Sequence, residues 1–203
     1  HKGSEARVKK IIEIATESKA WGIKFQYRGI KNFYATKNQI GDEILSNEIE
    51  KSNLEFSNIV KFSKYAKKLN LNVGISFFRT EDLIKKKNYL KYFDFLKIPS
   101  AEFENDDLIN LAKKSNKDVF ISTGGNNENK ILDKIKKLNK KKFVVFHCIS
   151  NYPTITGFQQ LGFLKKLNKI KNLRIGYSSH DKDWEINLIA MSLGINFIER
   201  HLT

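Results

Sequence analysis

Residues 142–147 read Lys-Phe-Val-Val-Phe-His, with four consecutive apolar side chains between two polar ones. A short, continuous apolar run of this kind is typical of a strand that is covered on both faces, as in a parallel sheet. Residues 128–138 before it and residues 158–167 after it have the spacing of amphipathic helices. The sequence therefore predicts a strand between two helices at this point.

The same alternation extends along the whole chain. Strands are predicted at residues 22–26, 72–77, 93–98, 118–122, 142–147, 173–177 and 195–199. Helices are predicted at residues 5–19, 54–69, 81–90, 106–113, 128–138, 158–167 and 184–193. No change in composition marks a linker, so we expect one α/β domain over residues 1–203 with a parallel sheet.

The number of units favours a closed barrel over an open sheet. The first predicted element is a helix and the last is a strand, so one strand before His1 and one helix after Thr203 would complete eight βα units. That count describes a (β/α)8 TIM barrel that is incomplete at both ends, with seven of its eight strands present. A doubly wound open sheet is the alternative, but no Gly-x-Gly-x-x-Gly motif follows any predicted strand.

Composition excludes several classes of protein. Hydrophobic residues make up 40% and charged residues 29% of the 203 positions, which is typical of a globular domain and excludes disorder. No apolar run is long enough for a membrane span. Cys148 is the one cysteine, so no disulfide framework is possible and we expect a reducing cytoplasm.

The net charge of +15 comes mainly from lysine, which is spread over every region together with asparagine and isoleucine. Nucleic-acid binders usually concentrate positive charge, often as arginine, on one face. We therefore interpret the lysines as a compositional bias and expect no nucleic-acid partner. The positive field still favours a small anionic substrate.

Polar residues gather where the predicted strands end, which is where the active sites of barrels lie. Lys24 and Gln26 are two apart on one strand and share a face. Lys97 lies inside an apolar strand, where an ammonium group is costly without a partner. Lysines beside hydroxyls and glycine-rich backbone suit a phosphate or a carboxylate.

His180 and His201 follow consecutive predicted strands, and Ser178 and Glu199 precede them by the same offset. Neighbouring strands lie about 4.8 Å apart, so both imidazoles could reach one divalent ion that water or substrate completes. The alternative is two unrelated histidines that bond to backbone carbonyls. His147 lies one strand further away and is not expected to join them.

Six motifs in order carry a family resemblance across essentially the whole chain. They are Lys24-Phe25-Gln26, Lys97-Ile98-Pro99-Ser100-Ala101-Glu102, Ile121-Ser122-Thr123-Gly124, His147-Cys148-Ile149-Ser150-Asn151-Tyr152-Pro153-Thr154, Ile175-Gly176-Tyr177-Ser178-Ser179-His180 and Glu199-Arg200-His201-Leu202-Thr203. Together they resemble the barrel of the N-acetylneuraminate (sialic acid) synthase family, which includes legionaminic and pseudaminic acid synthases. The resemblance implies condensation of phosphoenolpyruvate with an N-acetylated amino sugar such as N-acetylmannosamine, assisted by Mn²⁺ or Mg²⁺.

The resemblance also implies a role for each matched residue. His180 and His201 would be the metal ligands, and Glu102 the acid/base carboxylate. Gln26 and Tyr152 would contact the sugar. The residues implied for the phosphate and carboxylate of phosphoenolpyruvate are Lys24, Lys97, Ser100, Ser122, Ser150 and Ser178.

This chain departs from the family pattern in several places. Phe77 replaces a common threonine, Gly125 replaces a methionine, and Ser179 stands where an aspartate usually precedes the metal histidine. The glutamate of the first strand and the C-terminal antifreeze-like domain are absent. In the family that domain reaches across a homodimer to the sugar, so we expect this fragment alone to be inactive.

Two other function classes stay open at this stage. One is a barrel aldolase or lyase with Lys97 or Lys24 as a Schiff-base nucleophile. The other is a non-enzymatic lysine-rich protein that binds DNA. Residues 27–53 are either a lid over the site or a surface insertion.

Overall fold

The computed structural model describes residues 3–29 and 53–202. The chain divides into two compact units, residues 1–95 with residue 203, and residues 96–202. One synthase domain over residues 1–203 stays a prediction. The segment 27–53 is expected to be a lid or an insertion, and most of it lies outside the described residues.

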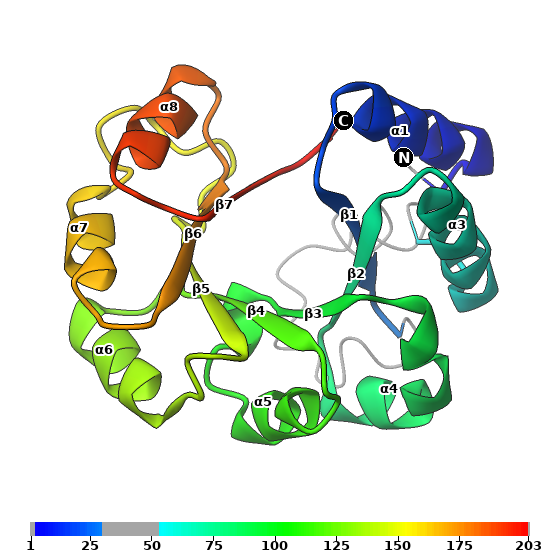
Figure 1. Cartoon of the computed structure of the whole chain (residues 1–203), viewed down its shortest axis with the longest axis horizontal. Coiled ribbons are helices and arrows are strands. Elements are labelled where there is room, and N and C mark those ends of the chain that lie inside the picture. The colour runs from blue at the N-terminus through cyan, green and yellow to red at the C-terminus, as the bar shows by residue number, and fades with distance from the viewer. Residues whose placement is uncertain (1–2, 30–52, 203) are drawn as a thin grey trace, which may run out of the picture. The chain divides into compact units, whose positions relative to one another are not determined.

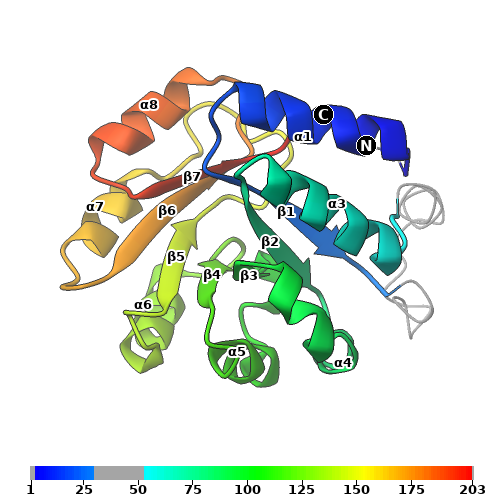
Figure 2. The same cartoon turned by 45° about the vertical axis from the view of Figure 1, so that its right-hand side comes forward.

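Within residues 3–29 and 53–95, the first unit contains two parallel strands. Its elements are α1 (Glu5–Glu17), β1 (Gly22–Tyr27), α3 (Phe56–Lys68), β2 (Asn72–Phe77), α4 (Thr80–Lys85) and a 3-10 helix, η2 (Lys87–Tyr92). Strands β1 and β2 pair in parallel from Gly22 opposite Asn72 to Tyr27 opposite Phe77. Helices α1 and α3 pack on each other and on these strands (Figure 2). They bury apolar stripes that include Ile12 and Ile59.

The second unit continues the alternation of strands and helices. Its elements are β3 (Phe95–Ile98), which begins at the boundary between the units, a 3-10 helix η3 (Ser100–Glu102), α5 (Asp106–Lys113), β4 (Asp118–Ser122), α6 (Glu128–Lys137), β5 (Phe143–His147), α7 (Gly162–Asn168), β6 (Arg174–Ser179), α8 (Glu185–Ser192) and β7 (Phe197–Arg200). Strands β4, β5, β6 and β7 pair in parallel in chain order. Helices α5 to α8 all lie along one side of these strands (Figure 1).

Asparagine side chains begin two of these helices. Asn105 Oδ1 accepts from the Leu108 N–H at 3.0 Å, and Asn127 Oδ1 accepts from the Lys130 N–H at 2.9 Å. Each side chain satisfies an N–H group that the first helical turn leaves without a backbone partner. The helix starts predicted near residues 106 and 128 are confirmed.

Strand β5 lies at the centre of the second unit, between β4 and β6. Phe143, Val144 and Val145 are fully buried. Gly176 on β6 lies against Phe146, because a Cβ built at Gly176 would come within 2.6 Å of the Phe146 ring. The aromatic side chain fills the space that the glycine leaves empty.

Some predicted boundaries are wrong. The helix predicted from residue 158 begins at Gly162, because Gln160 has a positive φ of 50° and cannot continue a right-handed helix. The predicted helix 81–90 is divided into α4 and η2. Strand β6 continues to Ser179, two residues beyond the predicted end.

The α/β class with parallel strands is confirmed in both units. Closure into an eight-stranded barrel stays a prediction. Within residues 3–29 and 53–202, no helix is long and apolar enough to cross a lipid bilayer.

The contact between Gly176 and Phe146 gives a test of packing. Gly176→Ala should lower the free energy of unfolding by about 1–3 kcal/mol, because the added methyl group overpacks the core. Gly162→Ala is the matched control, since nothing lies within 4 Å of a Cβ at that exposed helix start. Urea unfolding of both variants measures the difference, and equal effects would contradict the packing described here.

Candidate functional site

The carboxyl ends of β6 and β7 bring two histidines together. Ser178 lies opposite Glu199 in the parallel register, which is the common level that their equal offset predicts. His180 and His201 follow two residues later, and their ring centroids are 5.7 Å apart. The structure therefore shows the expected nearness of the two rings.

Tyr152 lies between the two imidazoles. Its hydroxyl oxygen is 2.5 Å from Nε2 of His180 and 3.3 Å from Nε2 of His201. Its ring also stacks on His180, with centroids 3.8 Å apart. Two ring nitrogens from neighbouring strands thus converge on one oxygen atom.

The tautomer of His180 follows from its other nitrogen. Nδ1 lies 2.6 Å from the backbone carbonyl of Ile149, which can only accept, so Nδ1 carries the hydrogen. Nε2 is left with a lone pair that faces Tyr152. A carbonyl partner behind the ring is the usual arrangement for a metal-binding histidine.

This donor set fits a divalent ion with open coordination positions. Two imidazole nitrogens are suitable ligands. No group of three or more His, Cys, Asp or Glu side chains in the described parts of the chain has a geometry that could hold a metal. A metal at this point would therefore need water or substrate to complete its shell, and the metal itself stays a prediction.

His147 is separate from the histidine pair, as predicted. Its Nε2 lies 2.7 Å from the backbone oxygen of Gln159, and its ring packs between Phe163 and Tyr177. The side chain is 4% exposed. Burial lowers the pKa of His147 below its ordinary value, which the bond to Gln159 only partly offsets.

Lys97 on β3 forms a buried ion pair with Glu199. Its Nζ lies 3.3 Å from the Glu199 carboxylate, and its side chain is 1% exposed. The ammonium also lies 3.9 Å from the centroid of the Phe146 ring. Ser178 donates its hydroxyl to the other Glu199 oxygen at 3.0 Å. One carboxylate thus joins two residues that the sequence implies for anion binding.

The loops after β3, β4 and β5 meet at Gly124. The Gly124 N–H donates to Ser100 Oγ at 3.1 Å and to Cys148 Sγ at 3.2 Å. A Cβ at Gly124 would collide with Ser150 Oγ at 2.3 Å. Glycine is therefore required for two of the predicted serines to approach each other. Cys148 is buried and also takes part in this contact.

Ser122 closes β4 near this cluster. It is 3% exposed, and its Oγ has no hydrogen-bond partner among the residues that the structure describes. A buried hydroxyl without a partner loses stability that a ligand could restore. Ser122 is a suitable donor to an anion.

Three predicted site residues are not joined to these groups. Glu102 accepts a hydrogen bond from Asn105 Nδ2 at 2.8 Å, and no bond described for it reaches the histidines or Lys97. Lys24 and Gln26 lie on β1 in the first unit, opposite Gly74 and Ser76. Their positions relative to the second unit are not defined.

The sequence did not assign a role to Glu199 or to Gly124. Two features of the sequence could have indicated Glu199. It lies inside a short strand, two residues before His201, and another apolar strand of the chain contains a lysine. A buried lysine needs an anionic partner. Gly124 carried the weaker signal of a Gly-Gly pair after a strand.

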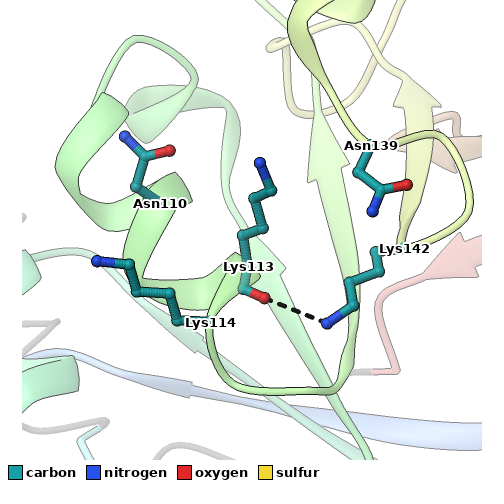
Figure 3. Close-up of a pocket in the computed structure, with 5 residues that line it drawn as sticks. All are labelled: Asn110, Lys113, Lys114, Asn139 and Lys142. Atoms are coloured by element: carbon teal, nitrogen blue, oxygen red, sulfur yellow. Dashed lines mark hydrogen bonds between the residues drawn. The ribbon is translucent and has the colours of Figure 1, made fainter.

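A cavity of about 360 Å³ lies at the other ends of the strands (Figure 3). It is lined by Asn110, Lys113, Lys114, Asn139 and Lys142. The Lys142 ammonium donates to the backbone oxygen of Lys113 at 3.4 Å. These residues precede β4 and β5, whereas every predicted site residue of this unit lies within or after its strand. The cavity is therefore separate from the candidate site.

The buried ion pair predicts an asymmetric loss of stability. Glu199→Gln removes a counterion from an almost inaccessible ammonium and should lower the free energy of unfolding by about 3–5 kcal/mol. Glu128→Gln is the control, since Glu128 pairs with Lys166 in an exposed position. That change should cost about 0–1 kcal/mol. Similar losses in guanidinium unfolding would show that Lys97 does not depend on Glu199.

The lowered pKa of His147 predicts a pH dependence. The unfolded chain takes up a proton near the ordinary pKa of 6.5, whereas the folded chain resists until lower pH. Stability should therefore fall as the pH drops below about 6.5, because the unfolded state binds more protons. His147→Gln should make this decline shallower in urea unfolding between pH 7.5 and 5. A variant that declines as steeply as the wild type would exclude His147 as the source.

Comparison with known proteins places the chain in a family. The model of the NeuB family matches residues 11–203. N,N'-diacetyllegionaminic acid synthase from Campylobacter jejuni is 31% identical over 219 residues, covering 100% of this chain and 64% of the relative. N-acetylneuraminate-9-phosphate synthase from Drosophila melanogaster is 27% identical, covering 100% of this chain and 57% of the relative. The chain thus spans about three fifths of the length of the curated relatives it matches.

A solved structure agrees with these matches. The N-acetylneuraminic acid (sialic acid) synthetase from Leptospira borgpetersenii, crystallised with citrate, superposes with a TM-score of 0.86 at 26% identity. The match covers 100% of this chain and 70% of that protein. The family model, the relatives and the fold agree, and the chain belongs to the NeuB family of sialic acid synthase-type enzymes.

Proposed function

We propose that the complete protein condenses phosphoenolpyruvate with an N-acetylated amino sugar, with the uptake of one water molecule, to form a nonulosonic acid and phosphate. The observation that carries the proposal is the placement of two kinds of group side by side. The Lys97–Glu199–Ser178 network lies within β3, β6 and β7, and the His180–His201 pair follows the last two of these strands. Family membership supports the reaction class.

The anion-binding half would hold phosphoenolpyruvate. Lys97 supplies positive charge, while Ser178 and Ser122 supply hydrogen bonds; the Ser122 hydroxyl has no partner among the described residues. Ser100 and Ser150, which both approach Gly124, lie shortly after the ends of β3 and β5. We place Lys24 with them, on the basis of the family resemblance. Fixed donors of this kind orient the substrate and screen its charge during attack on a second molecule.

The histidine half would bind the acceptor sugar through a divalent ion, Mn²⁺ or Mg²⁺. Such an ion, when bound to His180 and His201, supplies positive charge at the aldehyde oxygen of the open-chain sugar. Tyr152 and Gln26 would contact the sugar hydroxyls. Glu102 would move a proton at the reacting carbons after release from Asn105.

The proposal extends to the whole molecule. The complete protein would fold as a (β/α)8 barrel, with the site at the carboxyl ends of its strands. By resemblance to the family it would act as a cytoplasmic homodimer with a further domain near the sugar. Neither a nucleic acid nor a membrane is a proposed partner.

The test measures phosphate release by the complete protein from phosphoenolpyruvate, with a panel of N-acetylated amino sugars as acceptors. Release should require one of the sugars, stop after EDTA treatment, and return when Mn²⁺ or Mg²⁺ is added. Mass spectrometry should detect a product that joins both carbon chains. His180→Ala/His201→Ala should abolish the reaction.

Three results would overturn parts of the proposal. Release that survives exhaustive EDTA treatment would refute the metal role. A lysine trapped by borohydride with substrate would favour the Schiff-base aldolase instead. Release independent of any sugar would refute the condensation.

A further inference from the structure

Asp181 is a buried carboxylate directly after His180 that has no role in the proposed chemistry. It is 4% exposed and bonds on the side of β6 that faces the helices. Its Oδ2 accepts from Tyr177 Oη at 2.6 Å and from Ser179 Oγ at 2.8 Å. Because Tyr177 and Ser179 alternate with Ser178 and His180, these bonds lie on the opposite face of β6 from the site.

The main chain of Asp181 contacts two further segments. Arg200, the neighbour of His201 in the chain, donates from Nη2 to the Asp181 backbone oxygen at 2.8 Å. Thr154 pairs with Asp181 in an isolated parallel bridge, and the Thr154 N–H donates to the His180 carbonyl at 2.9 Å. Thr154 lies two residues after Tyr152. The segments that carry His180, His201 and Tyr152 therefore all meet at Asp181.

We propose that Asp181 is a positioning residue that holds His180 and His201 in the arrangement a divalent ion requires. The inference rests on the proposed function, because it assigns Asp181 a purpose in metal binding. Asp181 touches neither imidazole, so it acts through the backbone on both sides of His180.

The side-chain bonds explain why a carboxylate is suited to this position. Burial and the bond to Asp181 raise the pKa of Tyr177, so Tyr177 stays a hydrogen-bond donor. Two hydroxyl donors on one oxygen fix the carboxylate, and the carboxylate fixes the turn after β6. Ser179 is the last residue of β6, and its hydrogen bond to Asp181 fixes the direction of the chain just after the strand.

The test compares three substitutions in the complete protein by electron paramagnetic resonance titration with Mn²⁺. Asp181→Ala should weaken Mn²⁺ binding about 10- to 100-fold, the usual loss when a group that orients metal ligands is removed. Asp181→Asn keeps an oxygen acceptor for Tyr177 and Ser179 and should stay within a few-fold of the wild type. Asp133→Ala, which removes an exposed carboxylate bonded to Lys136, should have no effect.

Two further measurements separate positioning from stability and from the proposed function. Ile109→Ala creates a cavity beneath the buried face of α5 and should lower the melting temperature without changing Mn²⁺ affinity. Long-range ¹H–¹⁵N spectra of the metal-free protein should show the His180 tautomer with hydrogen on Nδ1 in the wild type, and its loss in Asp181→Ala.

The outcomes are distinguishable. If the wild type binds no Mn²⁺, the metal role of the proposed function fails, and the tautomer spectra alone decide on Asp181. An Asp181→Ala protein with wild-type Mn²⁺ affinity or an unchanged His180 tautomer overturns the inference. Equal weakening by Asp181→Ala and Ile109→Ala overturns it as well, since general loss of stability would then be the cause.

Discussion

The burial of a charged lysine among apolar strands is the constraint on which the site of the second unit depends. An ammonium in that environment requires a carboxylate at close range, and Glu199 supplies it from the last strand. The pairing fixes the level of β7, because Glu199 also accepts from Ser178 on β6. Once this level is set, the residues that follow Ser178 and Glu199 must leave the sheet side by side.

The parallel register turns that local requirement into a site. Parallel strands all end at the same edge, so groups from distant parts of the sequence meet there without any long-range pattern between them. The groups proposed for anion binding and the two imidazoles are therefore brought close together by the order of the strands. Gly124 shows how closely these loops approach, because it leaves no room for a Cβ between Ser100 and Ser150.

The sequence predicted the type and order of the elements well, since continuous runs such as Phe143–Phe146 have few alternatives to a buried parallel strand. The equal spacing of Ser178 and Glu199 from the two histidines predicted the nearness of the rings. Boundaries were less predictable. The start of α7 depends on the backbone of Gln160, and the Gln159 carbonyl there bonds to His147, a contact between residues 12 positions apart.

The partners of the site residues were also beyond reach of the sequence. Spacing places a residue at a strand end but does not say which side chain it bonds to. Lys97 therefore predicted an anion site, while its ion pair with Glu199 is evident only in the folded structure. The sequence also gave no sign of a role for Asp181, because its bonds to Tyr177 and Ser179 lie on the face of the sheet opposite the candidate site.

The hydroxyl of Tyr152 has a kinetic consequence. It lies where the lone pair of His180 and the nearest nitrogen of His201 converge, so any ligand that engages both nitrogens must first displace it. Binding of such a ligand would then take two steps, departure of the Tyr152 hydroxyl and coordination by the two histidines. The observed binding rate would level off at high ligand concentration, when departure of the hydroxyl becomes rate-limiting. Because the phenol leaves a stacked imidazole, its ultraviolet absorbance would report that departure directly.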